Sequence, residues 1–187
     1  MRKVILAVSL SSVLLVTQSN AGDLYLGTSL GKSNFSLSGS EKAEFASDGV
    51  SITDKSATSY KLYTGYRFNP NFALEFSYAN LGELKMNAGS IHGKTEANSV
   101  GVSALGIIPI YENLEFFGKL GVHRWDTKTK VLFDDFTETT SESGTNVHYG
   151  IGASYILNQI ALRVEIERFK VDKANSTLVT TGISYRF

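Results

Sequence analysis

Four ionisable residues stand in the middle of segments that otherwise alternate between apolar and small residues: Glu75, Lys119, Arg163 and Glu165. Each lies on the parity that also carries most of the glycines. Small and charged residues fit the narrow interior of a closed barrel, whereas the opposite parity is branched or aromatic and fits lipid. An unpaired buried charge is costly, so we expect these four residues to neutralise one another in a shared lumen.

Residues for catalysis or metal binding are sparse. The histidines are His92, His123 and His148, and the positions two residues later hold Lys94, Trp125 and Gly150. None is serine, although one group of lipid-modifying outer-membrane enzymes uses that spacing. Asp134-Asp135 has no partner base at a useful distance in sequence. No metal-ligand cluster is visible. We therefore expect no enzyme, no metal and no cofactor.

The elements that would position the four charges are strands, because the chain alternates with period two. Eight segments do so, and they pair into four hairpins: 24–35, 59–68, 72–79, 99–108, 114–125, 147–157, 160–169 and 178–187. Trp125 breaks the parity of its segment, so a bulge or the strand end is expected there. The pattern predicts an all-β chain, an eight-stranded antiparallel up-and-down transmembrane β-barrel.

The connections between these segments alternate in length. Residues 69–71, 109–113 and 158–159 are short, whereas residues 36–58, 80–98, 126–146 and 170–177 are longer, polar and expected to be loops. Short and long connections alternate in barrels with one periplasmic and one external end, which places both termini in the periplasm. Aromatic residues near the segment ends, among them Phe169, are expected to form two interfacial girdles. A soluble lipocalin-like barrel would also alternate, but it would turn its charges outward.

Both chain ends fit export to the outer membrane. Arg2 and Lys3 precede an apolar run from Val4 to Val16, and Ser19-Asn20-Ala21 provides a cleavage site. Residues 1–21 are therefore expected to be a signal peptide, and residues 22–187 the barrel domain; the run is too short for a spanning anchor. At the other end, Tyr185 and Phe187 place aromatics on the apolar parity of the last strand, and we expect them to be an assembly signal.

Composition narrows the class further. The chain contains no cysteine, so no disulfide framework is expected. Cleavage would remove two of 18 basic residues and leave 16 against 18 acidic ones, a balance that gives no electrostatic basis for binding nucleic acid.

Several stretches together resemble the transmembrane domain of the OmpA family, in order and spacing: residues 24–31, 63–70, 117–128, 161–165 and 182–187. Larger members continue into a periplasmic peptidoglycan-binding domain, whereas this sequence ends at Phe187, so peptidoglycan anchoring is not carried over. In the family, a glutamate of the third strand meets basic residues in the lumen, and exchange of partners is thought to gate a small pore. The resemblance places that glutamate at Glu75, with Arg163 and Lys119 as partners; Leu105 stands where the family has another basic residue.

Two interpretations of function stay open. The charge cluster can be purely structural pairing or the gate of a narrow, porin-like passage. Alternatively, the loops, above all residues 36–58 and 126–146, can act in surface recognition or adhesion toward a partner that the sequence does not name. The partners expected in either case are outer-membrane lipid, lipopolysaccharide and the barrel-insertion machinery, with the protein a monomer.

Overall fold

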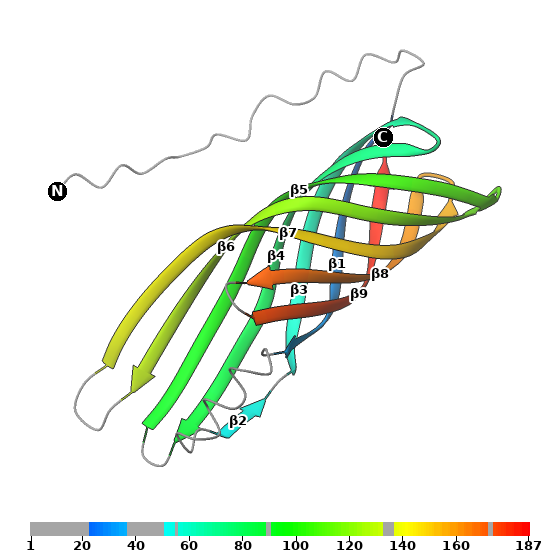
Figure 1. Ribbon diagram of the computed structural model, residues 1–187. Coiled ribbons are helices and arrows are strands. Elements are labelled where there is room, and N and C mark those ends of the chain that lie inside the picture. The colour runs from blue at the N-terminus through cyan, green and yellow to red at the C-terminus, as the bar shows by residue number, and fades with distance from the viewer. Residues whose placement is uncertain (1–22, 37–50, 55, 89–90, 133–136, 172–173) are drawn as a thin grey trace.

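The computed structural model describes residues 23–36, 51–54, 56–88, 91–132, 137–171 and 174–187 (Figure 1). The expected signal peptide, residues 1–21, lies outside the described residues. The strands are β1 (Asp23–Ser36), β2 (Ser51–Asp54), β3 (Ser56–Asn69), β4 (Phe72–Ala88), β5 (Ile91–Tyr111), β6 (Leu114–Leu132), β7 (Thr137–Leu157), β8 (Ile160–Val171) and β9 (Ala174–Arg186). The described residues include no helix long and apolar enough to cross a membrane.

All strands but β2 form one closed barrel. The antiparallel order runs β4-β3-β1-β9-β8-β7-β6-β5, and β5 pairs back with β4. The seam between the first and last strands is continuous from Tyr25↔Arg186 to Ser36↔Asn175. Because no edge of the barrel is left open, every backbone group in its wall can pair without water. The predicted eight-stranded antiparallel barrel is confirmed.

The outer surface of the barrel is apolar. Strand β8 alternates strictly, with Ile160, Leu162, Val164 and Ile166 exposed and the residues between them buried. Phe76, Val102, Ile151 and Ile183 face outward in the same way on other strands. A lipocalin would show the opposite arrangement, so the soluble alternative is excluded.

The two ends of the barrel differ. The turn end holds Asp23, Phe187 and the short turns β3–β4, β5–β6 and β7–β8, and the opposite end is called the loop end. Asn158 adopts a left-handed conformation (φ 56°) in the two-residue turn before β8, a position that asparagine tolerates. Pro109 lies beside a register shift in β5, where a missing N–H is tolerated.

The prediction of long loops was wrong for much of the loop end. Strands β4, β5, β6 and β7 run past the ends of β8 and β9 (Figure 1). Strands β5 and β6 stay paired as far as His92↔Leu132, and β6 and β7 as far as Leu132↔Thr137. Strand β2, which was not predicted, pairs with β4 near Met86. We call this extension (β4–β7 beyond the barrel, with β2) the rim sheet. In the rim sheet no lumen or lipid requires apolar and polar residues to alternate. The alternation is therefore weak in the sequence, although the backbone pairing continues.

Candidate functional site

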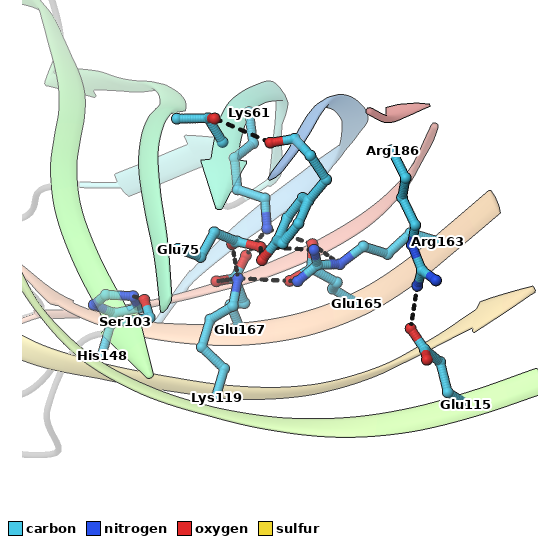
Figure 2. A network of polar contacts seen from close by, with 12 residues as sticks. Lys61, Glu75, Ser103, Glu115, Lys119, His148, Arg163, Glu165, Glu167 and Arg186 are labelled. Atoms are coloured by element: carbon cyan, nitrogen blue, oxygen red, sulfur yellow. Dashed lines mark hydrogen bonds and ion pairs between the residues drawn. The ribbon is translucent and has the colours of Figure 1, made fainter. Parts of the chain in front are cut away.

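The inward-facing residues of β6 give the order of layers along the lumen. From the turn end the larger of these residues are Glu115, Phe117, Lys119, His123 and Trp125, and all five are buried. Around them gather, in the same order, a small ion-pair group, an aromatic layer, a charge cluster, a histidine pair and an apolar lid. Figure 2 shows the charge cluster between the His148–Ser103 contact on one side and the Arg186–Glu115 contact on the other.

The charge cluster is centred on Glu75 of β4, which has no exposed surface. Its carboxylate accepts hydrogen bonds from Lys119 Nζ at 2.6 Å, from Arg163 Nη1 at 2.7 Å and from the Tyr25 hydroxyl at 3.1 Å. Lys119 also donates to Glu165 at 2.9 Å, and Arg163 Nη2 donates to Glu165 at 3.1 Å. The structure thus brings together all four residues singled out in the sequence, and Glu75 contacts both basic partners.

Two further members were missed: Lys61 of β3 and Glu167 of β8. Lys61 Nζ donates to both Glu165 and Glu167, and Lys119 donates to Glu167 at 3.0 Å. The signal was present, since Lys61 shares a parity with Gly65 and Glu167 shares one with Glu165. With both included, the cluster holds three cations and three carboxylates. This balance satisfies the requirement that charges in a low-dielectric interior be paired.

An aromatic layer closes the cluster toward the turn end. The Arg163 guanidinium lies 4.2 Å from the centroid of the Phe117 ring and 4.7 Å from that of Tyr63. Tyr25 packs edge-on against Tyr63 at 6.3 Å. Leu105, the departure from the family pattern, belongs to this layer and is 3% exposed. An apolar residue there adds packing to this layer, whereas the third cation of the cluster is Lys61.

A separate ion-pair group lies at the turn end. Glu115 accepts from Arg67 Nη1 and from Arg186 Nη2, each at 2.8 Å. These residues belong to β6, β3 and β9, so the carboxylate ties three walls of the barrel together. The cavity that they line holds about 30 Å³, room for roughly one water molecule.

Above the cluster lie two buried serine–histidine contacts. His123 Nδ1 is 2.9 Å from Ser99 Oγ, and His148 Nε2 is 2.8 Å from Ser103 Oγ. Neither serine is two residues from its histidine, so the spacing considered in the sequence could not reveal these pairs. The Phe169 ring stacks on His148 at 5.0 Å.

Two aromatic residues were misassigned from sequence. Phe169 is 1% exposed and faces the lumen, so it belongs to no interfacial girdle. Trp125 continues the inward parity of β6 without a bulge and packs with Phe35, Leu81 and Leu178 in the apolar lid. Both errors have one cause: near the loop end the lumen itself is apolar, so an aromatic residue does not mark the lipid face.

The predicted assembly residues lie at the closing seam. Tyr185 and Phe187 are exposed on the outer face, with ring centroids 5.0 Å apart. The Phe187 N–H donates to the Leu24 carbonyl at 3.0 Å, which extends the pairing of β1 with β9 to the last residue of the chain. His92 pairs with Leu132 in the rim sheet, and Asp134-Asp135 lie outside the described residues.

A closed barrel with an apolar outer band and a filled, charged lumen defines an integral β-barrel protein of the outer membrane. The model of the OmpA-like transmembrane domain matches residues 19–187, and the chain belongs to this family.

Known relatives agree with the assignment. Outer membrane protein A of Salmonella typhi is 28% identical over 195 residues, covering 97% of this chain and 54% of the relative. That of Shigella flexneri is 29% identical over 140 residues, 67% of this chain and 39% of the relative. The chain thus spans about half or less of these curated relatives.

Solved structures with the same fold include Ail, the attachment invasion locus protein of Yersinia pestis. It has 20% identity and a TM-score of 0.61, with 89% of this chain and 99% of that one covered. The N-terminal β-barrel domain of Pseudomonas aeruginosa OprF has 14% identity and a TM-score of 0.56, with 88% and 97% covered.

Proposed function

We propose that this chain is a structural protein of the outer membrane whose lumen is closed at rest. The observation that carries the proposal is the charge cluster, in which six paired side chains are each at most 5% exposed. The aromatic layer and the apolar lid enclose the cluster from both ends. Moving an ion through would require breaking several short ion pairs at once in a low-dielectric interior.

Single-channel recording of the purified protein in planar bilayers tests the proposal. We expect no steady current from the wild type and none from Glu75→Ala, although the variant should be less stable. Steady current in the wild type contradicts the closed lumen. Glu112→Gln, which removes an exposed carboxylate from the β5–β6 turn, is the matched control.

A gated narrow pore is the second candidate, and a specific contact favours it. Lys119 donates to Glu75, Glu165 and Glu167, so its ammonium can exchange carboxylate partners without losing all its ion pairs. If exchange opens a passage, Glu75→Ala raises the conductance. The same recording therefore separates a structural plug from a gate.

Surface recognition is the third candidate, and the rim sheet favours it. Rigid elements projecting past a membrane-embedded barrel can present side chains to a partner. Ail, the attachment invasion locus protein of Yersinia pestis, shares the fold. Deleting residues 129–140 would shorten the β6–β7 hairpin in register, because Lys128 pairs with Ser141. Reduced adherence of expressing cells to cultured host cells, with the barrel intact, supports this role; unchanged adherence contradicts it.

We also propose that the turn end and both termini face the periplasm, that the insertion machinery reads the end of β9, and that the barrel is a monomer. Short turns gathered at the terminal end support this orientation. A tag in the β6–β7 hairpin should be accessible on intact cells, and a tag after Phe187 should not. We infer no catalysis, because Ser99, Ser103 and their histidines are at most 3% exposed.

A further inference from the structure

Basic residues are distributed unequally between the two ends of the outer surface. At the turn end, the basic residues that the structure describes are Arg67 and Arg186, and both contact Glu115 in the lumen. At the loop end, Lys32 of β1 and Arg168 and Lys170 of β8 are exposed, each on the parity that faces outward. The lipid-facing band therefore ends in cations at one end only.

These three cations form one patch. Strand β9 is the single strand between β8 and β1, so the patch spans two strand spacings, about 10 Å, across the strands. Along the strands it extends from Lys32, which is level with Ile166, to Lys170. Arg168 pairs with Thr177, which in turn pairs with Asn34, so hydroxyl and amide side chains lie between the basic groups. No outward-facing position of β8, β9 or β1 in the described ranges carries Asp or Glu, and none of the three cations forms an ion pair with a described residue.

The patch adjoins an apolar furrow on the outer surface. The furrow has a volume of about 1000 Å³ and is lined by Lys32 at β1 and by Thr181, Val164, Ala153 and Phe116 on the following strands. The register places Thr181, Val164, Ala153 and Phe116 in one row across β9, β8, β7 and β6. The small side chains of Thr181 and Ala153 leave room between bulkier neighbours, enough for an acyl chain lying obliquely across the strands.

We propose that the loop-end surface of β8, β9 and β1 is a binding site for lipopolysaccharide. The phosphates of its lipid A lie on Arg168, Lys170 and Lys32, and one acyl chain lies in the furrow. Phosphate oxygens suit this set, because guanidinium and ammonium groups donate charge-assisted hydrogen bonds and Thr177 and Asn34 add neutral ones. The choice of lipopolysaccharide over an anionic phospholipid rests on the proposed orientation, which puts the loop end in the outer leaflet.

Native mass spectrometry of the refolded full chain in detergent, titrated with a short-sugar lipopolysaccharide, tests the site. Each basic residue near a lipid headgroup contributes roughly a fivefold change in affinity, so Arg168→Gln/Lys170→Gln should weaken retention about 30-fold. The matched control is Lys128→Gln/Lys130→Gln, which removes the same charge from exposed residues of the rim sheet and should retain the lipid as the wild type does. An equal loss of lipopolysaccharide retention in both double variants overturns the proposal.

Two further arms identify the ligand. Dephosphorylated lipopolysaccharide and phosphatidylglycerol should both bind at least tenfold more weakly than the intact lipid. Equal retention of either one overturns the assignment to lipid A phosphate. Ala153→Phe fills the furrow without changing charge and should weaken binding of lipopolysaccharide. Unchanged affinity would contradict the proposal that an acyl chain lies in the furrow. The assay measures lipid retention in detergent and depends neither on the orientation of the barrel in a membrane nor on its conductance. A negative result is therefore distinguishable from a failure of the closed-lumen proposal.

Discussion

Replacing Glu75 by alanine should destabilise the barrel by about 3 kcal/mol. Breaking a buried ion pair by removing one partner costs roughly 3–5 kcal/mol, because the other charge is left uncompensated. Here Lys119 keeps Glu165 and Glu167, and Arg163 keeps Glu165, so the lower end of that range applies. The cluster nevertheless becomes one positive charge in excess, and the buried Tyr25 hydroxyl loses its acceptor.

Urea unfolding of the protein in lipid vesicles measures this free energy. Trp125 is the single tryptophan of the chain and is 5% exposed in the apolar lid, so its fluorescence reports opening of the lumen. The double variant Glu75→Gln/Lys119→Met restores the balance of charge at two of each sign. Its free energy of unfolding should exceed the value predicted by adding the effects of Glu75→Gln and Lys119→Met, by roughly 0.5–3 kcal/mol.

The outcome that would refute the reasoning is specific. If Glu75→Ala unfolds within about 0.5 kcal/mol of the wild type, as an ordinary surface change does, the cluster is hydrated and its pairs are weak. If the changes in free energy of unfolding of the two single variants add up to that of the double variant, Glu75 and Lys119 are not coupled. Glu112→Gln should leave the unfolding midpoint unchanged, since that side chain is exposed in a turn.

Three further outcomes are expected. Gly182→Val should prevent heat-modifiable migration on gels, because a Cβ there would lie 2.1 Å from Ser29 Oγ at the closing seam. Gly118→Ala should be silent, because a Cβ there would have no heavy atom within 4 Å beyond its own residue and its chain neighbours. Val164→Arg should lower the free energy of unfolding by about 2–4 kcal/mol in vesicles, as a charge facing mid-bilayer does, and an unchanged midpoint would argue against a lipid-facing β8. Deleting Phe187 should lower the yield of barrel in outer membranes while leaving refolding in detergent intact; equal yields would count against the assembly signal.

The barrel itself could be predicted because lipid and lumen impose opposite demands on successive residues. Val164 and Glu165 are neighbours in sequence, but the first faces lipid and the second faces the lumen. Apolar and lumen residues therefore alternate with period two in every spanning segment. Beyond the membrane the constraint disappears, and the rim sheet was expected to be loop. Near the lid the lumen is apolar too, so the aromatic character of Trp125 and Phe169 suggested the wrong environment although their parity points inward.

The site was partly predictable for the same reason. Glu75, Lys119, Arg163 and Glu165 stood out as charges within apolar segments. Lys61 and Glu167 lie on the same lumen parity but were passed over, because alternation gives a side chain's direction and not its height in the barrel. Pairing across the lumen depends on strand register and shear, which only the structure supplies. The serine–histidine contacts were hidden likewise, since Ser103 and His148 are 45 positions apart.

With the loop end facing outward as proposed, the rim sheet changes what an approaching partner would meet. Strand β5 continues seven residues from Asn98 to Ile91, which extends it by about 23 Å at the usual strand rise. Cross-strand pairing already fixes this backbone, so a partner that docks on it does not have to order a mobile chain first. The conformational entropy normally lost when loops bind was lost at folding instead, and in the rim sheet every second position of a strand lies on the same face. Recognition here would select for shape and register, and single substitutions on one face should alter it without disturbing the other.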